Sequence, residues 1–284
     1  LGANPRGVAI SPDGLTLYVN NVLDGTLMVI DTASHEITAT VDITDIPLTP
    51  EILLGKQIFN RASEPDLATD NWISCAVCHF DGGSDRQTWL GFPDGPRNTP
   101  SLLGVGDTLP IHWSGDLDEL QDVELTIRNI QAGEGLAPGP ELDSLGSPHT
   151  GLSEELDALA AFMDSLKVGP SLVNIDADSA ARGALVFGEQ GCATCHEPPL
   201  FIDKKIHDVG TGNAATERNS HDRGTQFDTP SLLGLWESSP YFHDGSAATL
   251  REVFTNGTVH NVVDDLSEDE LQDMVKYLLT LPTD

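Results

Sequence analysis

The sequence predicts a mainly α-helical protein, built from two copies of one helical unit with long loops and preceded by a four-stranded β segment. Three observations predict this. Residues 46–168 and 169–284 contain the same short sequence motifs in the same order. Each of these halves ends in an amphipathic helical pattern. Residues 4–43 alternate short β-type runs with turns. A chain of 284 residues is long enough for two or three domains with their own cores. We therefore expect a β segment at 1–45, a first helical domain at 46–168 and a second at 169–284.

The β segment contains four runs rich in β-branched residues, with Asp13-Gly14 and Asp24-Gly25 as turn signals. The runs are residues 7–11, 16–20, 26–30 and 37–41. The stretch resembles one blade of a YVTN-type β-propeller, and the alternative is an ordinary four-stranded sheet. One blade cannot bury both faces alone, so we expect an apolar face that needs a partner, in an oligomer or a larger assembly.

The two helical halves share several segments, which indicates an internal duplication. The matching pairs are 54–59 with 182–187, 99–104 with 229–234, and 110–115 with 240–245. Each half closes with an amphipathic helix, at 153–166 and at 267–281, and a serine heads each helix as its N-cap. Gly, Pro and Asp are frequent between these marks, so long loops are expected.

All four cysteines lie in two copies of the motif C-x-x-C-H. The copies are Cys75, Cys78 and His79, and Cys192, Cys195 and His196. On one helical turn, residues i, i+3 and i+4 share a face, so two thiols can bond the haem vinyl groups while the imidazole reaches the iron. A zinc half-site would need further ligands, and a redox dithiol leaves the histidines unexplained. The motifs predict two covalently bound haem c groups, with His79 and His196 as iron ligands, in two cytochrome c-type domains.

The chain carries 45 acidic and 14 basic residues, for a formal net charge of -31. This charge argues against nucleic acids and anionic membranes as partners. The negative charge is consistent with a basic redox protein as partner, because the electrostatic field of the chain would attract it to the surface. The alternative is that the charge reflects adaptation to a salty habitat. No apolar run approaches the 18 or so residues of a membrane span, so none is expected.

The order of the motifs resembles that of the bacterial dihaem cytochrome c peroxidase and MauG superfamily, over residues 48–284. The resemblance rests on C-x-x-C-H, GPRNTPSL (95–102), a Trp-x-Gly segment, a second C-x-x-C-H and FDTPSLLGLWESSPYFHDGSAATL (227–250). It implies two facing cytochrome domains, one haem that stores electrons and one that reacts with peroxide. It also implies a periplasmic or extracellular location, because c-type haem is attached outside the cytoplasm.

Two further roles follow from the resemblance. Asn98 falls where the family supplies a calcium ligand, with backbone carbonyls near Thr229 and Pro230 completing an oxygen-only site. Trp113 falls between the two haems. The alternatives are a turn-capping role for Asn98 and a core position for Trp113.

The sixth iron ligands depart from the family pattern. His260 stands where the distal ligand of the second haem falls, with His207 as competitor and His243 as a neighbouring hydrogen-bonding residue. The loop at 80–92 lacks the histidine that peroxidases carry for the first haem. We expect His112 on that distal side, ahead of His149, the repeat counterpart of His260.

A peroxidase also needs an acid–base group over the first iron, and Glu134 lies near the family's distal glutamate. With His112 and Trp113 it completes the expected catalytic group. The predicted function is a peroxidase-like oxidoreductase that moves electrons between two haems and reduces hydrogen peroxide at the first. The alternatives are a non-catalytic electron-transfer module with both haems six-coordinate, assembled through the β segment, and MauG-like oxidation of a protein partner.

Overall fold

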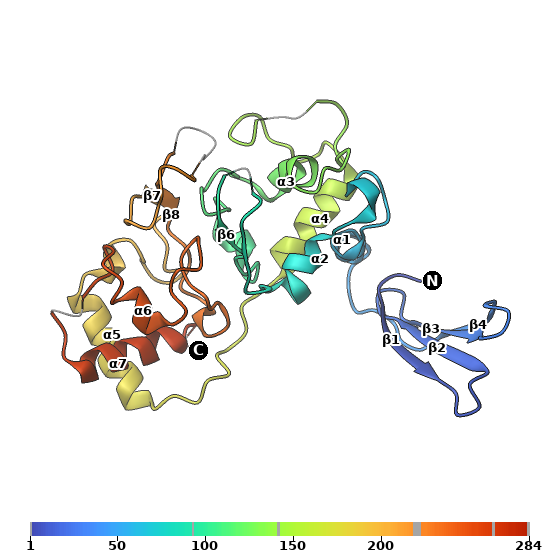
Figure 1. The fold of residues 1–284 in the computed structure, drawn as a ribbon, viewed down its shortest axis with the longest axis horizontal. Coiled ribbons are helices and arrows are strands. Elements are labelled where there is room, and N and C mark those ends of the chain that lie inside the picture. The colour runs from blue at the N-terminus through green and yellow to red at the C-terminus, as the bar shows by residue number, and fades with distance from the viewer. Residues whose placement is uncertain (1, 93, 141–142, 218–222, 263–264, 283–284) are drawn as a thin grey trace.

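The structure is a computed structural model that describes residues 2–92, 94–140, 143–217, 223–262 and 265–282. Three parts follow one another along the molecule: a β-sheet at one end, a first helical unit in the middle and a second helical unit at the other end (Figure 1). The mainly helical fold with an N-terminal four-stranded sheet agrees with the prediction. In the described ranges no helix is long and apolar enough to cross a membrane.

The N-terminal sheet is an antiparallel meander in the order β1-β2-β3-β4. Its strands are β1 (Pro5–Ile10), β2 (Thr16–Asn21), β3 (Thr26–Asp31) and β4 (Ile37–Asp42). The four β-type runs are therefore confirmed. Gly14 and Gly25, in the two Asp-Gly turns, have φ of 74° and 65°, a left-handed conformation that glycine adopts without a steric penalty.

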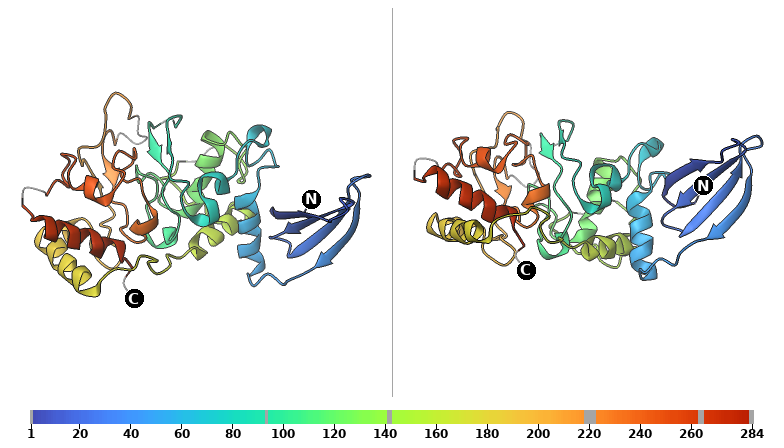
Figure 2. Two further views of the ribbon diagram at one scale, coloured as in Figure 1. Left: turned by 60° about the horizontal axis from the view of Figure 1, so that its bottom comes forward. Right: turned by 90° about the horizontal axis from the view of Figure 1, so that it is seen from below.

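The sheet is buried only along its middle strands. Val19 and Met28 are buried, and Gln57 of the first helix donates a hydrogen bond to the Leu23 carbonyl at 3.2 Å. Figure 2 shows the sheet beyond the first helix, at the end of the molecule. Its outer strands carry exposed apolar side chains, namely Val8, Ile10, Ile37 and Val41. The unpartnered apolar surface that the sequence predicts is present on these strands.

The first helical unit packs two long helices against each other around a buried core. Its elements are α1 (Pro50–Asn60), η1 (Thr69–Asn71), α2 (Cys75–Cys78), η2 (Phe80–Gly82), β5 (Thr88–Trp89), β6 (Arg97–Asn98), η3 (Val105–Asp107), η4 (Leu120–Asp122), α3 (Val123–Asn129) and α4 (Glu154–Ser165). Phe59 of α1 meets Phe162 of α4 edge to face at 5.1 Å. Gly55 lets the helices approach, because a Cβ there would lie 1.9 Å from the Ala158 carbonyl oxygen.

The second helical unit repeats this design. Its elements are α5 (Ala177–Glu189), η5 (Cys192–Thr194), β7 (Ile206–His207), β8 (Phe227–Asp228), η7 (Leu235–Glu237), α6 (Leu250–Val253) and α7 (Glu268–Leu279). Gly183 of α5 takes the place of Gly55, because a Cβ at Gly183 would lie 2.0 Å from the Asp273 carbonyl oxygen. The loops repeat as well: His112 and Phe242 have φ of 68° and 69°. Each unit has its own core, while the exact boundaries at 45 and 168 stay predictions.

The loops of the two helical units meet each other, while their long helices lie on the outer sides (Figures 1 and 2). The backbone N–H of Asn98 donates to the His243 carbonyl at 2.5 Å, and that of Asp228 donates to the Trp113 carbonyl at 2.8 Å. A buried ion pair joins Arg97 of the first unit to Glu217 of the second at 2.7 Å. These contacts place the two C-x-x-C-H motifs around a common interior.

Candidate functional site

One large cavity, of about 1270 Å³, runs between the two helical units. All six residues of the two C-x-x-C-H motifs line it, together with residues from both units. Most of its surface is apolar, as a porphyrin ring requires. The two motifs therefore share one interior. Its first pocket is the part beside Cys75, Cys78 and His79, and its second pocket is the part beside Cys192, Cys195 and His196.

The two motif histidines are arranged as metal ligands. Nδ1 of His79 lies 3.3 Å from the Gly83 carbonyl, and Nδ1 of His196 lies 3.0 Å from the Phe201 carbonyl. Burial lowers the pKa of His79 to about 4 and also lowers the pKa of His196, so both rings are neutral. A neutral imidazole that donates its Nδ1 proton to a carbonyl keeps the Nε2 lone pair for a metal.

The cysteines do not have the character of redox or zinc thiolates. Burial, with Asp85 and Cys75 nearby, raises the pKa of Cys78 to about 11. Burial also raises the pKa of Cys192 and of Cys195, whereas reactive thiolates have lowered pKa values. These thiols stand protonated beside an apolar cavity, which suits thioether bonds to haem vinyl groups.

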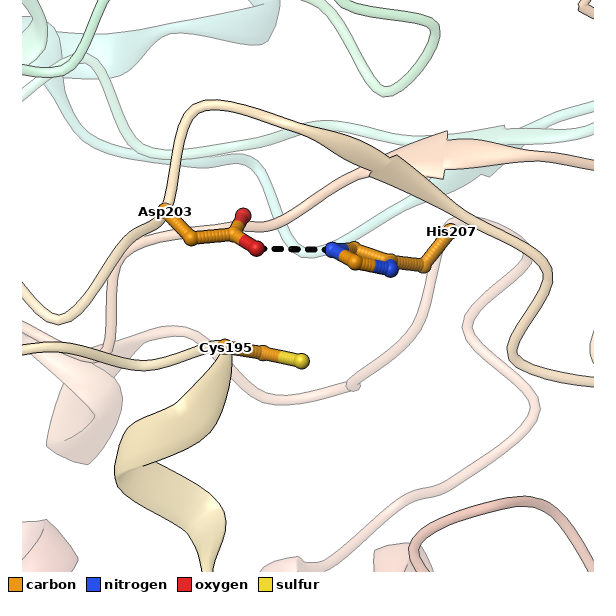
Figure 3. Close-up of side chains that lie close together, drawn as sticks. All are labelled: Cys195, Asp203 and His207. Atoms are coloured by element: carbon orange, nitrogen blue, oxygen red, sulfur yellow. Dashed lines mark hydrogen bonds and ion pairs between the residues drawn. The ribbon is translucent and has the colours of Figure 1, made fainter.

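One cluster of metal-binding side chains does include a motif cysteine. Cys195, Asp203 and His207 place one ligand atom each within 4.8 Å of the others. Figure 3 shows the Asp203 carboxylate facing the His207 ring, 2.8 Å apart, with the Cys195 sulfur to one side. His207 is therefore held by Asp203 at the edge of the second pocket, which weakens its case as a distal iron ligand.

The second pocket presents His260 opposite His196. Their ring centroids are 6.4 Å apart. Metal–imidazole bonds of about 2 Å on either side of one ion, plus half a ring each, give a separation of about 6 Å. Burial, and then the neighbouring His196, lowers the pKa of His260 to about 4, and its buried Nδ1 has no hydrogen-bond partner in the described structure. These features fit a histidine on each axial side of one haem iron.

The first pocket presents His112 differently. It lines the cavity, but Nδ1 lies 3.1 Å from an Asp116 carboxylate oxygen and Nε2 lies 3.3 Å from the Thr126 hydroxyl. Its repeat counterpart, Phe242, lies beside His260 at 5.7 Å rather than in the place of the ligand. His112 therefore lines the cavity with both ring nitrogens engaged in hydrogen bonds.

Two expected residues lie elsewhere. His149 is outside the cavity lining and is buried, with its Nδ1 2.9 Å from an Asp122 carboxylate oxygen. Glu134 is exposed and also outside the lining, because its backbone N–H is bonded to the Pro65 carbonyl on the surface. Neither side chain lines the cavity that the two motifs share.

Gln131 is a cavity residue that the sequence did not reveal. Its side chain is buried, its amide nitrogen lies 3.6 Å from the Cys75 sulfur, and its Oε1 has no hydrogen-bond partner in the described structure. A single glutamine in a loop carries no pattern that separates it from a surface residue. It supplies a polar but non-titrating group to the first pocket.

Trp113 lies where the two units meet. Its Nε1 donates to the Asn98 carbonyl at 2.7 Å, and its ring lies edge-on to His243 at 6.4 Å. His243 in turn bonds Glu217 at 3.0 Å and stacks on Phe227 at 3.9 Å. Trp113 and His243 both line the cavity where the two units meet.

The side chain of Asn98 is buried beside carbonyl groups of the second unit. Its amide nitrogen contacts the Pro240 and Phe242 carbonyl oxygens, and its Oδ1 has no hydrogen-bond partner in the described structure. A calcium site completed by the Thr229 and Pro230 carbonyls stays a prediction; the Thr229 hydroxyl donates to Asp203 at 2.8 Å. Buried amide and carbonyl oxygens are donors that a hard cation accepts.

Comparison with known proteins agrees with this geometry. Residues 49–137 match the family model of the di-haem cytochrome c peroxidases, and residues 180–282 match that of cytochrome c. The methylamine utilization protein MauG of Methylorubrum extorquens is 29% identical over 83% of this chain and 79% of its own length. The cytochrome c551 peroxidase of Nitrosomonas europaea is 28% identical over 81% of this chain and 79% of its own length.

Solved structures share the fold. A hydrazine synthase chain of Kuenenia stuttgartiensis superposes with a TM-score of 0.62 at 24% identity, covering 84% of this chain and 90% of that chain. The diheme peroxidase BthA of Burkholderia thailandensis has a TM-score of 0.57 at 17% identity, covering 84% and 87%. The relatives favour an enzyme over a non-catalytic electron-transfer module. Two C-x-x-C-H motifs around one interior, with similarity to peroxidases along most of the sequence, make this chain a dihaem peroxidase-like oxidoreductase that is similar to the di-haem cytochrome c peroxidases and MauG.

Proposed function

We propose that the protein reduces hydrogen peroxide in the first haem pocket, with electrons that enter at the second. One observation carries this proposal: the two pockets differ on their distal sides. His260 faces His196 across the second pocket at 6.4 Å, while His112 in the first pocket is held to one side by Asp116 and Thr126. His196 and His260 would together hold the haem of the second pocket, whereas the first pocket would leave room for peroxide beside its haem.

Haem c, when bound, supplies the one-electron chemistry. Peroxide reduction also consumes protons, and His112 is the titratable cavity residue best placed to move them. Asp116 accepts hydrogen bonds from Nδ1 of His112 and from the Ser114 hydroxyl at 2.7 Å. This carboxylate orients the imidazole, and Nε2 lies 3.3 Å from the Thr126 hydroxyl. Glu134, on the surface, has no part in this step.

Three further parts complete the proposal. Trp113 is the route between the pockets, because it lines the shared cavity and is bonded to both units. Asn98 and the Pro240 carbonyl hold a calcium ion that locks the units together. A basic redox protein is the electron donor, which a net charge of -31 would attract, in the periplasm or outside the cell.

The N-terminal sheet serves assembly in this proposal. It is one blade of a β-propeller-like array, and its exposed outer strands pack on a neighbouring sheet. The four-stranded antiparallel order and the apolar side chains on β1 and β4 support this role.

The test follows the reaction of the reduced dihaem protein with hydrogen peroxide by stopped-flow absorbance. Replacing His112 by glutamine removes the proton carrier but keeps a polar side chain of similar size, and should slow oxidation about 10²-fold or more. Glu134→Gln is the matched control and should react like the parent. An undiminished rate in His112→Gln would refute the proton role, and a parent that does not react with peroxide would refute the peroxidase function.

A further inference from the structure

Glu119, Asp122 and His149 form a cluster of metal-binding side chains outside the haem cavity. One ligand atom of each lies within 4.8 Å of the other two. Asp122 and His149 are each only 1% exposed, and Glu119 is half-buried. None of the three lines the haem cavity, so the peroxidase chemistry does not explain them.

His149 is the member that most needs an explanation. Its Nδ1 lies 2.9 Å from Oδ1 of Asp122, yet neither ring nitrogen makes a hydrogen bond within the ranges that the structure describes. Leaving a buried polar atom without a partner is costly, so native proteins rarely do so without a ligand or a bound ion. A cation between the imidazole and the carboxylates would satisfy the ring.

Backbone hydrogen bonds hold the two carboxylates in place. Oδ2 of Asp122 accepts from the N–H groups of Asp118 at 2.8 Å and Glu119 at 3.1 Å. Glu119 accepts from the His149 N–H and from the Thr150 hydroxyl, the latter at 2.8 Å. Each carboxylate oxygen has two lone pairs, so these bonds orient the groups and still leave sites for a metal. Among the ion pairs of the described residues, His149 is the one partner of Asp122, and no lysine or arginine neutralises the cluster.

We propose that Glu119, Asp122 and His149 bind one divalent transition-metal ion. One imidazole and two carboxylates suit zinc, which takes such ligands at about 2.0–2.2 Å and leaves the fourth position to water. For a given set of nitrogen and oxygen ligands, zinc also binds more tightly than manganese. The site is separate from the cation site at Asn98, which offers oxygen ligands only.

The ion would fasten the loop before α4 to the turn η4. That loop also bonds the segment next to the first haem, since the Ser144 hydroxyl contacts the Asp116 carbonyl. Asp116 is the residue that holds His112. A metal ion bound here would therefore restrict the motion of the segment that carries Asp116 and His112, from a position outside the haem cavity.

The experiment uses the protein with both covalent haems, freed of loosely bound metal by a chelator and kept in excess calcium. Zinc is titrated by calorimetry, and the bound ion is examined by zinc X-ray absorption. One zinc per chain should bind, with one imidazole and otherwise oxygen donors, and it should raise the thermal midpoint. His149→Gln should weaken binding at least tenfold, while His35→Gln, at an exposed turn of the sheet, should leave it unchanged.

Three outcomes would overturn the proposal: no zinc binding tighter than about 100 μM (roughly -5 kcal/mol), a zinc spectrum without imidazole, or equal affinity in parent and His149→Gln. Any of these would leave a plain buried ion pair between His149 and Asp122. If His149→Gln fails to retain its haem spectrum, Glu119→Gln at the half-buried ligand provides the same comparison. Peroxide turnover is not the readout, so a failure here is independent of the proposed function.

Discussion

At the scale of single residues, the histidines of the cavity differ in the hydrogen bonds that their ring nitrogens make, and these bonds determine which nitrogen is free to bind a metal. His79 and His196 direct Nδ1 to backbone carbonyls, so Nε2 remains for iron. His112 uses both nitrogens in hydrogen bonds, so it suits proton transfer. His260 has a buried ring nitrogen without a partner and faces His196. The hydrogen-bond environment, rather than position in the chain, separates the proposed iron ligands from the proposed proton carrier.

The first prediction concerns His260. Replacing it by alanine should remove the distal ligand of the second iron and convert one of the two haems from low spin to high spin, because a strong axial imidazole is lost. Absorbance and electron paramagnetic resonance of the oxidised protein measure this. His207→Ala is the control and should keep both haem signals, since its ring is bound to Asp203. A high-spin signal in His207→Ala together with an unchanged spectrum in His260→Ala would identify His207 as the ligand instead.

At the scale of elements, both helical units depend on a glycine at the crossing of their two long helices. Gly55 lies against α4 and Gly183 lies against α7, and in each case a Cβ would come within 2.0 Å of a carbonyl oxygen on the partner helix. The close approach brings large side chains such as Phe59 and Phe187 into the two cores. The duplicated glycine therefore sets the interhelical distance in both units.

The second prediction tests this crossing. Gly183→Ala should destabilise the second unit by about 1–3 kcal/mol, because the added methyl group forces α5 and α7 apart. Gly188→Ala, in the same helix with no atom within 4 Å of its Cβ position, should be neutral or stabilise by up to about 1 kcal/mol. Chemical denaturation followed by circular dichroism gives both values. Equal effects of the two substitutions would show that the crossing has room for a methyl group.

At the scale of the whole molecule, two properties belong to no single element: the contact between the helical units and the net charge of -31. The contact is polar and buried, with Arg97, Glu217 and His243 linked by an ion pair and a hydrogen bond. Trp113 lies beside this network and lines the shared cavity. The charge, spread over all three parts, acts on stability and on encounters with partners.

The third prediction concerns Trp113. Trp113→Phe should slow electron transfer between the haems, because it removes the indole and its hydrogen bond to the Asn98 carbonyl, while both haem spectra stay intact. Flash photolysis or stopped-flow mixing with a one-electron reductant measures the rate. Trp89→Phe, at a tryptophan outside the cavity lining, is the control. A rate in Trp113→Phe equal to that of the control would mean that electrons take another route.

The fourth prediction concerns the charge. Raising sodium chloride from 0.01 M to 1 M shortens the Debye length from about 30 Å to about 3 Å, so repulsion between the excess carboxylates should fall and the thermal midpoint should rise by several degrees. The association rate of a basic electron donor should fall over the same range. Differential scanning calorimetry tests the first effect, with an uncharged solute at equal osmolality as control. A midpoint that falls with salt would show that attractive ion pairs outweigh the repulsion.

The sequence by itself determined the features that depend on a few neighbouring residues. The four strands, their Asp-Gly turns and the helices capped by Ser153 and Ser267 were predicted and are present. The C-x-x-C-H motifs identified the haem pockets because their spacing alone sets the geometry of attachment. The repeated motifs revealed the internal duplication for the same reason. Each half forms its helices and turns from local sequence patterns, so both halves carry the same motifs in the same order.

Only the tertiary structure decided which side chains reach the pockets from the long loops. Loops have no periodicity, so nothing in the sequence says whether His149 or Glu134 turns inward, and both lie outside the cavity. Asn98 meets the Pro240 carbonyl across 142 residues of chain, and Gln131 reaches Cys75 across 56. Such contacts form only when the helical cores bring distant loops together, because the entropy of closing a long loop is offset by packing elsewhere in the fold.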